Sequence, residues 1–100
     1  MYRKEYNFYL YILASCQKGT LYIGITNNIL NRNFQHKIKY DKNSFTAKYN
    51  VDKLVYYETY QYIQDAIQRE KQMKAWKRQW KINLIEKENP EWRDLFIDML

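Results

Sequence analysis

The chain is short of the residues that build cross-links, metal clusters and flexible linkers. Its 100 residues include one cysteine, Cys16, one histidine, His36, two glycines and one proline. A single thiol cannot form an internal disulfide, and one histidine with one cysteine cannot supply a zinc-type ligand cluster. No stretch has the composition of a linker, so the sequence predicts one domain over residues 1–100.

Long apolar runs are also missing. Residues 1–5 (MYRKE) lack the apolar segment of a secretory signal peptide, and no run approaches the ~20 apolar residues of a transmembrane helix. A lone cysteine suits a reducing compartment. These features predict a cytoplasmic protein without a membrane partner.

Positive charge and aromatic side chains are plentiful instead. Lys and Arg total 17 against 11 Asp and Glu, the formal net charge is +6, and 18% of the residues are aromatic. A basic surface interleaved with aromatic side chains suits nucleic acid, because phosphate contacts supply most of the sequence-independent affinity. Many small basic proteins bind nothing specific. Charge alone therefore does not decide between a nucleic-acid-binding protein and a basic protein without a specific ligand.

Two runs of strand-forming residues near the start of the chain have the pattern of a β-hairpin. Residues 8–13 read FYLYIL and residues 21–26 read LYIGIT. A four-residue connecting loop would pair Tyr11 with Gly24 and place Tyr22 on the same face as Tyr11. Because the glycine has no side chain, we expect a concave spot lined by the two tyrosine hydroxyls.

The rest of the pattern predicts one more strand and four helices. We expect a polar loop at 41–50, the third strand within 51–60, and helices at 28–40, 61–76, 77–87 and 91–96. The order is strand, strand, helix, strand, helix, helix, followed by a short terminal helix. It predicts an α+β fold in which helices flank a small three-stranded antiparallel sheet.

Apolar spacing indicates which helix faces should be buried. Leu30, Phe34 and Ile38 recur every fourth residue and are expected to pack on the sheet. Trp76 and Trp80, also four residues apart, are expected in the core rather than at a base-stacking surface. The helix at 77–87 should turn Trp80 inward.

Glu70 stands inside the apolar stripe of the helix at 61–76, four residues after Ala66 and three before Met73. A carboxylate in such a position is costly unless a cation or a strong donor meets it. One interpretation is an ion pair with a nearby Lys or Arg. The other is a metal ligand.

The spacing of four polar side chains resembles the GIY-YIG nuclease family. The segments YLY at 9–11 and YIG at 22–24 stand where the family has its two triplets, and Arg32 and His36 follow Tyr22 by ten and fourteen residues. The likeness is greatest to small bacterial single-domain members, similar to the N-terminal nuclease module of the excision-repair endonuclease. It runs from about residue 6 to about residue 95.

The resemblance implies a metal-dependent nuclease and gives each residue a role. Tyr11 or Tyr22 would activate water, and the choice between them stays open because family members differ. Arg32 would stabilise charge on the phosphate, and His36 belongs to the same catalytic set. Glu70 would be the sole protein ligand of Mg²⁺ or Mn²⁺, with water and phosphate completing the shell.

Further residues are predicted to contact the substrate. Two other positions, described last, depart from the family pattern. The predicted contacts are the glycine of the second triplet, two lysines and an asparagine near the end of the domain: Gly24, Lys37, Lys48 and Asn89. Tyr9 stands where the first triplet usually has Gly. Ile25 stands where the repair branch has Lys, so any lowering of a tyrosine pKa must come from elsewhere.

Two functions are consistent with the sequence. One is a metal-dependent endonuclease of nucleic acid, DNA in preference to RNA, acting in repair or recombination. The other is a binding module on the same fold that cuts nothing or acts only with a partner. The joint presence of Tyr11, Tyr22, Arg32 and Glu70 favours the enzyme. The sequence leaves the oligomeric state, monomer or weak dimer, open.

Overall fold

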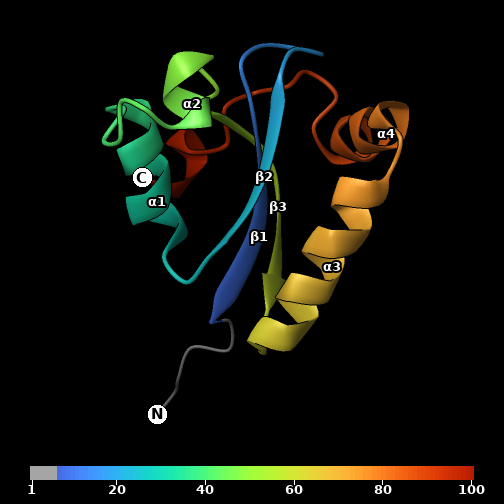
Figure 1. Cartoon of the computed structure of the whole chain (residues 1–100). Coiled ribbons are helices and arrows are strands. Elements are labelled where there is room, and N and C mark those ends of the chain that lie inside the picture. The colour runs from blue at the N-terminus through green and yellow to red at the C-terminus, as the bar shows by residue number, and fades with distance from the viewer. Residues whose placement is uncertain (1–6) are drawn as a thin grey trace.

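A three-stranded antiparallel sheet forms the centre of the molecule (Figure 1). The computed structural model describes residues 7–100, so the signal-peptide prediction for residues 1–5 lies outside the described part. The strands are β1 (Phe8–Ala14), β2 (Leu21–Thr26) and β3 (Lys53–Tyr60), in the order β2-β1-β3. The predicted α+β fold with this sheet is confirmed, and β2 is one of its two edge strands.

The hairpin has the predicted register. Tyr11 is paired with Gly24, and Leu13 with Tyr22. The connecting loop is closed by the Ser15 N–H, which donates to the carbonyl oxygen of Thr20 at 3.0 Å. Strand alternation therefore puts Tyr11 and Tyr22 on the same face, as expected.

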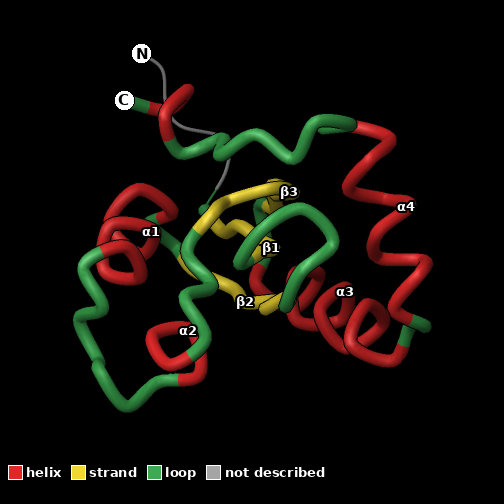
Figure 2. The backbone as a smooth tube through the Cα atoms, turned by 90° about the horizontal axis from the view of Figure 1, so that it is seen from above, coloured by secondary structure: helices red, strands yellow, loops and turns green. Residues whose placement is uncertain are grey.

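Helices cover both faces of the sheet (Figures 1 and 2). They are α1 (Ile29–Lys37) and α2 (Phe45–Lys48) on one face, α3 (Ile63–Ala75) and α4 (Arg78–Glu88) on the other, and a terminal 3₁₀ turn, η1 (Ile97–Met99). None of the helices formed by residues 7–100 has the length and apolar character that a bilayer span requires.

The alternation of β1 gives each face its own core. Leu10, Ile12 and Ala14 pack with the apolar residues of the α3 and α4 side, among them Met73, Ile82, Ile85 and Trp92. Tyr11 and Leu13 pack on the opposite face with Ile29, Val51 and Leu54. The predicted active-site tyrosine therefore belongs to the α1 face.

The predicted buried stripe of α1 is wrong. Leu30, Phe34 and Ile38 are 41%, 52% and 53% exposed, whereas Ile29 and Asn33 are buried. The Asn33 side chain donates from Nδ2 to the carbonyl oxygen of Ile29 at 3.1 Å, which lets a polar residue occupy the inner face. The helix is thus turned by one residue relative to the prediction.

Two other predictions need correction. The loop expected at 41–50 contains α2, whose first turn is capped by the Ser44 hydroxyl accepting from the Ala47 N–H at 3.2 Å. Residues 91–96 form no helix. In α4 the inner residues are Ile82 and Ile85, while Trp80 is 52% exposed and meets the partly buried Trp76 edge to face.

A carboxylate network fastens α3 to β3. Arg69 of α3 donates to both carboxylate oxygens of Glu58, and the guanidinium lies 5.0 Å from the ring centre of Trp76. The hydroxyls of Tyr56 and Tyr60 donate to the same carboxylate. Glu58 is therefore surrounded by donors from two elements.

The segment after α4 crosses back to the α1 side, past β3 (Figure 2). Asn89 donates from Nδ2 to the carbonyl oxygens of Val55 and Arg93, at 3.1 and 2.9 Å. The Leu95 N–H donates to the carbonyl oxygen of Leu54 at 2.7 Å. This segment therefore touches the sheet and the layers on both of its faces.

Candidate active site

Tyr11 lies at the centre of the candidate site, buried on the central strand with 1% of its surface exposed. Its ring crosses the sheet surface over Gly24, where a Cβ atom would lie 2.5 Å from the Tyr11 hydroxyl oxygen and 2.6 Å from Cζ. Only glycine allows this close approach. The expected concave spot above Gly24 is thus filled by the Tyr11 ring.

A line of hydrogen bonds leads from Tyr11 through α1 to α2. The hydroxyl oxygen of Tyr11 lies 3.2 Å from Nε2 of His36, and Nδ1 of His36 lies 2.9 Å from the hydroxyl oxygen of Thr46. Thr46 in turn lies 3.2 Å from the Ser44 hydroxyl oxygen. These bonds fix the orientation of the imidazole ring.

The protonation states of Tyr11 and His36 follow from their burial. Burial raises the pKa of Tyr11 to about 12, although the Arg32 guanidinium beside it acts in the opposite direction. Burial, with a further contribution from Arg32, lowers the pKa of His36 to about 4. At neutral pH the site therefore holds a protonated phenol and a neutral imidazole, which carries one ring proton and one acceptor nitrogen.

Tyr22 stands beside this pair on the edge strand. Its ring centre lies 6.2 Å from that of Tyr11 and 5.8 Å from that of His36. Unlike the buried Tyr11, Tyr22 is partly exposed and lines a cavity of about 300 Å³. Of the two tyrosines, Tyr22 is the one that solvent reaches more readily.

Arg32 brings the positive charge to the site. It lies on α1 one turn before His36, is exposed, and donates from Nη1 to Oε1 of Gln35 at 3.1 Å. The Tyr11 hydroxyl raises the pKa of Arg32 further above its usual range, so the guanidinium stays charged. Arg32 and His36 both line a second cavity, of about 220 Å³, between α1 and α2.

Glu70 lies on the other face, in α3, and its Oε2 is 3.0 Å from Nζ of Lys74. The structure thus has the ion pair that was one of the two interpretations of this carboxylate. Glu70 takes no part in the hydrogen bonds of Tyr11 and His36. Lys74, one helical turn further on, lines the same cavity as Tyr22. The Glu70 side chain is 22% exposed, so it is partly open to solvent.

Residues 7–100 contain no group of three or more His, Cys, Asp or Glu side chains that could enclose a metal ion. A hard cation that keeps most of its water needs only one protein carboxylate. A single accessible carboxylate such as Glu70 fits that mode of binding.

Two of the predicted substrate contacts have structural partners. Lys37 donates from Nζ to the carbonyl oxygen of Asp52 and to the carboxylate of Asp94. Asn89 is 5% exposed and uses both amide protons and its oxygen inside the protein. We therefore assign Lys37 and Asn89 to holding the C-terminal segment. Lys48 is exposed on α2.

Sequence reasoning missed Thr46, which holds His36, and Phe45, which stacks on Tyr22. Both lie on α2, which is too short for a hydrophobic period. The one local signal was Ser44, placed three residues before the amide that it caps.

In a comparison with protein families, the family model described as the GIY-YIG catalytic domain matches residues 7–83. The matched part contains β1, β2, α1, α2, β3, α3 and the first half of α4, and hence Tyr11, Tyr22, Arg32, His36, Thr46 and Glu70. Comparisons with curated proteins and with solved structures find no significant match.

Proposed function

The chain belongs to the GIY-YIG catalytic-domain family, and we propose that it is an endonuclease that hydrolyses phosphodiester bonds of DNA with Mg²⁺ or Mn²⁺ as cofactor. Members of this family are nucleases. The observation that carries the proposal for this chain is the packing of Tyr11, Tyr22 and His36 into one cluster beside the charged Arg32.

We assign proton abstraction from the attacking water to the phenolate form of Tyr22, which forms when the phenol releases its own proton to solvent. Water must reach the base, and Tyr22 is partly exposed whereas Tyr11 is 1% exposed. Tyr11, with its pKa raised to about 12, keeps its proton, and its hydroxyl is hydrogen-bonded to Nε2 of His36. Tyr11 and His36 then stay neutral, and their packing against the Tyr22 ring orients Tyr22.

Arg32 is assigned to the phosphate. Its guanidinium is permanently charged, exposed, and next to both tyrosines in the same site. It can donate two parallel hydrogen bonds to phosphate oxygens, and the charge that develops there in the transition state strengthens these bonds.

Glu70 is the residue that would hold the metal ion. A bound Mg²⁺ or Mn²⁺ would neutralise charge on the phosphate oxygens. Glu70 must release Lys74 to bind a cation, and this exchange is inexpensive because Lys74 is exposed and an i,i+4 ion pair on a helix contributes about 0.3–0.5 kcal/mol.

The Glu70–Lys74 pair also supports a second candidate, a nucleic-acid-binding module without cleavage. With Lys74 in place, the carboxylate is already neutralised. Ile25 stands where the repair branch of the family has Lys. In a binding module these two features would leave binding intact and weaken cleavage.

The setting of the activity is part of the proposal. The triplet spacing resembles the excision-repair endonuclease, which supports a role in DNA repair or recombination. The lone, exposed Cys16 supports a cytoplasmic location, because an unpaired thiol suits a reducing compartment.

The test is an incubation with labelled single-stranded, duplex and branched DNA, and with matched RNA, in Mg²⁺, Mn²⁺ or chelator. We expect metal-dependent cleavage of DNA that Tyr22→Phe abolishes. Metal-independent binding with no cleavage of any substrate would select the binding module instead. Cleavage that survives Tyr22→Phe would reassign the base.

A further inference from the structure

Three aromatic side chains form a row that leads outward from the active-site cluster. Tyr22 stacks on Phe45, with ring centres 6.5 Å apart and ring planes at 29°, and Phe45 contacts Tyr49 at 4.9 Å between ring centres. Phe45 and Tyr49 are 46% and 57% exposed. Rings that stay this exposed gain little from burial in the core, so packing alone does not account for their place.

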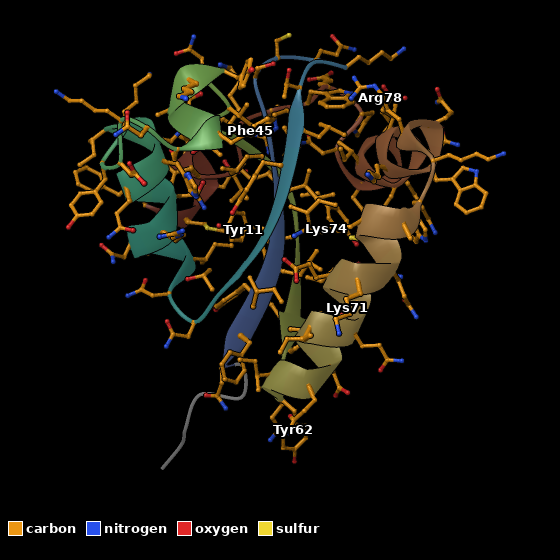
Figure 3. The ribbon with its side chains drawn as sticks, viewed as in Figure 1. Tyr11, Phe45, Tyr62, Lys71, Lys74 and Arg78 are labelled. Carbon is orange, nitrogen blue, oxygen red and sulfur yellow. The ribbon has the colours of Figure 1, made fainter. Side chains whose placement is uncertain are left out.

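Two lysines face this row across the free edge of β2. Leu21, Ile23 and the rings of Tyr22 and Phe45 line a cavity of about 300 Å³ together with Lys74 of α3 and Lys81 of α4; we call it the stacking cavity. Figure 3 shows Phe45 and Lys74 on opposite sides of β2. Lys81 makes no salt bridge with an acidic side chain of residues 7–100.

The wall of the stacking cavity is held in place by Arg78, the first residue of α4. Its Nη2 donates to the carbonyl oxygens of Lys18 and Gly19, at 2.6 and 2.7 Å, and so fixes the hairpin loop against α4. Leu21 and Tyr22 begin β2 directly after this loop. A rigid wall lowers the entropy cost of ligand binding.

Flat aromatic faces opposite ammonium groups match the chemistry of a nucleotide. The base can stack on a ring, and the phosphate can pair with a lysine. In a duplex both faces of each base are covered by neighbouring bases, so only an unpaired base can stack on a protein ring. Tyr22, which takes the proton from water in the proposed mechanism, belongs to the same row of rings. A nucleotide stacked on this row is therefore next to the reacting phosphate.

Resting on the nuclease function proposed above, we propose that the stacking cavity holds an unpaired nucleotide of the DNA beside the phosphate that is cut. The substrate is then DNA with a single-stranded stretch at the cleavage point, such as a gap, flap or bubble. A fully paired duplex of the same sequence lacks a base that can enter the cavity.

Binding measured in chelator tests this without cleavage. Fluorescence anisotropy would compare a gapped DNA with its fully paired counterpart, and 2-aminopurine in the gap would report stacking by loss of fluorescence. We expect wild type and Phe45→Trp to bind gapped DNA more tightly and to quench the probe. Phe45→Leu keeps an apolar side chain without a π face and should lose about tenfold in affinity for gapped DNA only.

Matched variants control for general effects. Tyr62→Leu removes another exposed ring, 60% exposed, at the far end of α3, away from Phe45 (Figure 3), and should change the affinity for neither DNA. Lys81→Gln removes one phosphate contact. The slope of log affinity against log salt concentration should therefore become less steep by ~0.7–0.9. Should Phe45→Leu lower the melting temperature strongly, Tyr49→Leu serves as the second variant; it removes the ring that contacts Phe45 from outside the cavity, so a smaller loss, again for gapped DNA only, is expected.

The outcomes separate the two proposals. The stacking proposal is contradicted if wild type binds gapped and paired DNA equally, or if Phe45→Leu and Tyr62→Leu have equal effects. Neither result affects the proposed nuclease function. If the protein prefers gapped DNA but cleaves no DNA in Mg²⁺ or Mn²⁺, the nuclease proposal is contradicted. Binding of an unpaired nucleotide in the stacking cavity is then still supported.

Discussion

Arg32 is the side chain whose loss should separate cleavage from binding. It is exposed, and its guanidinium meets Gln35 and the Tyr11 hydroxyl rather than apolar core side chains, so we expect Arg32→Ala to keep the packing of the core. Removing one positioned cation from a phosphoryl transition state costs on the order of a hundredfold in rate, whereas one phosphate contact among several costs little affinity.

The measurement for Arg32 is single-turnover cleavage beside DNA binding in chelator. Arg93→Ala removes an exposed arginine whose partner is Asp98, in the C-terminal segment, and provides the control. Equal losses of binding and cleavage in Arg32→Ala would show that Arg32 only holds the substrate.

Gly24 should be irreplaceable because the Tyr11 ring covers it. The new Cβ of Gly24→Ala would lie 2.5 Å from the Tyr11 hydroxyl oxygen, so the ring must leave His36. We expect a loss of about 1–3 kcal/mol in unfolding free energy, as for other overpacked sites, together with loss of cleavage.

Gly19→Ala is the matched control for Gly24→Ala. Its Cβ would lie 2.4 and 2.7 Å from the ends of the Ser15 and Cys16 side chains and 3.1 Å from the Cys16 backbone nitrogen, so side-chain rotation relieves most of the overlap at the expense of the hydrogen bond from the Thr20 N–H to Ser15. Denaturant unfolding and cleavage assays compare the two variants. Similar behaviour of both would contradict the role assigned to the Tyr11 ring.

At the scale of elements, α3 carries two carboxylate interactions with opposite expected consequences. Glu58, on β3, accepts from Arg69 and from two tyrosines, so Glu58→Gln leaves donors unsatisfied and should cost about 1–3 kcal/mol in unfolding free energy. Glu70 pairs only with the exposed Lys74, so Glu70→Gln should change stability little and should abolish metal-dependent cleavage.

Thermal unfolding without metal and cleavage over a Mg²⁺ or Mn²⁺ titration decide between these roles. If Glu70→Gln unfolds much earlier than wild type and still cuts with unchanged metal dependence, Glu70 is not the metal ligand. In that case its role is the ion pair alone.

The elements differ in how far the sequence could predict them. Strict alternation and a glycine opposite Tyr11 were enough for the hairpin register. Apolar spacing did not identify the inner face of α1, because the buried Asn33 donates from its side chain to the Ile29 carbonyl, while the more apolar Phe34 stays outside. Periodicity ranks residues by polarity and does not register such local hydrogen bonds.

For the site, spacing along the chain was sufficient where one hairpin and one helix bring residues together, as for Tyr11, Tyr22 and His36. It failed where the partner is distant in sequence. The pairing of Lys37 with Asp94 and the bond from Asn89 to Val55 depend on the path of the C-terminal segment, which no local pattern specifies.

For the whole molecule, two groups predict how stability depends on pH. The folded pKa of His36 is about 4, whereas an unperturbed histidine has a pKa of ~6.5. Between these values the unfolded chain binds a proton that the folded chain does not. The unfolding free energy should therefore fall as pH decreases through this window, and His36→Gln should remove this part of the decrease.

Glu58 acts at lower pH. Burial opposes its ionisation, but hydrogen bonds from Arg69 and two tyrosines prevail and lower the pKa of Glu58. Its contribution is complete above the ordinary carboxyl pKa of ~4.3 and is lost below it. Denaturant unfolding from neutral to acid pH should show both windows. A His36→Gln profile identical to that of wild type would contradict the first.

The net charge of +6 predicts that DNA binding depends strongly on salt and little on sequence. Phosphate contacts release counterions, so log affinity should fall linearly with log salt concentration. Anisotropy titrations at several salt concentrations on unrelated sequences provide the measurement. Constant affinity across salt, or preference for one duplex sequence, would contradict the expectation.

The path of the C-terminal segment has a consequence for biosynthesis. Lys37 on α1 is held by Asp94, Leu54 by Leu95, and Val55 by Asn89. A chain that grows from its N-terminus on the ribosome exposes the hairpin, α1 and β3 before residues 89–95 have been made. The helix that bears Arg32 and His36 therefore gains its last anchor late in translation, after all five predicted catalytic residues have been made.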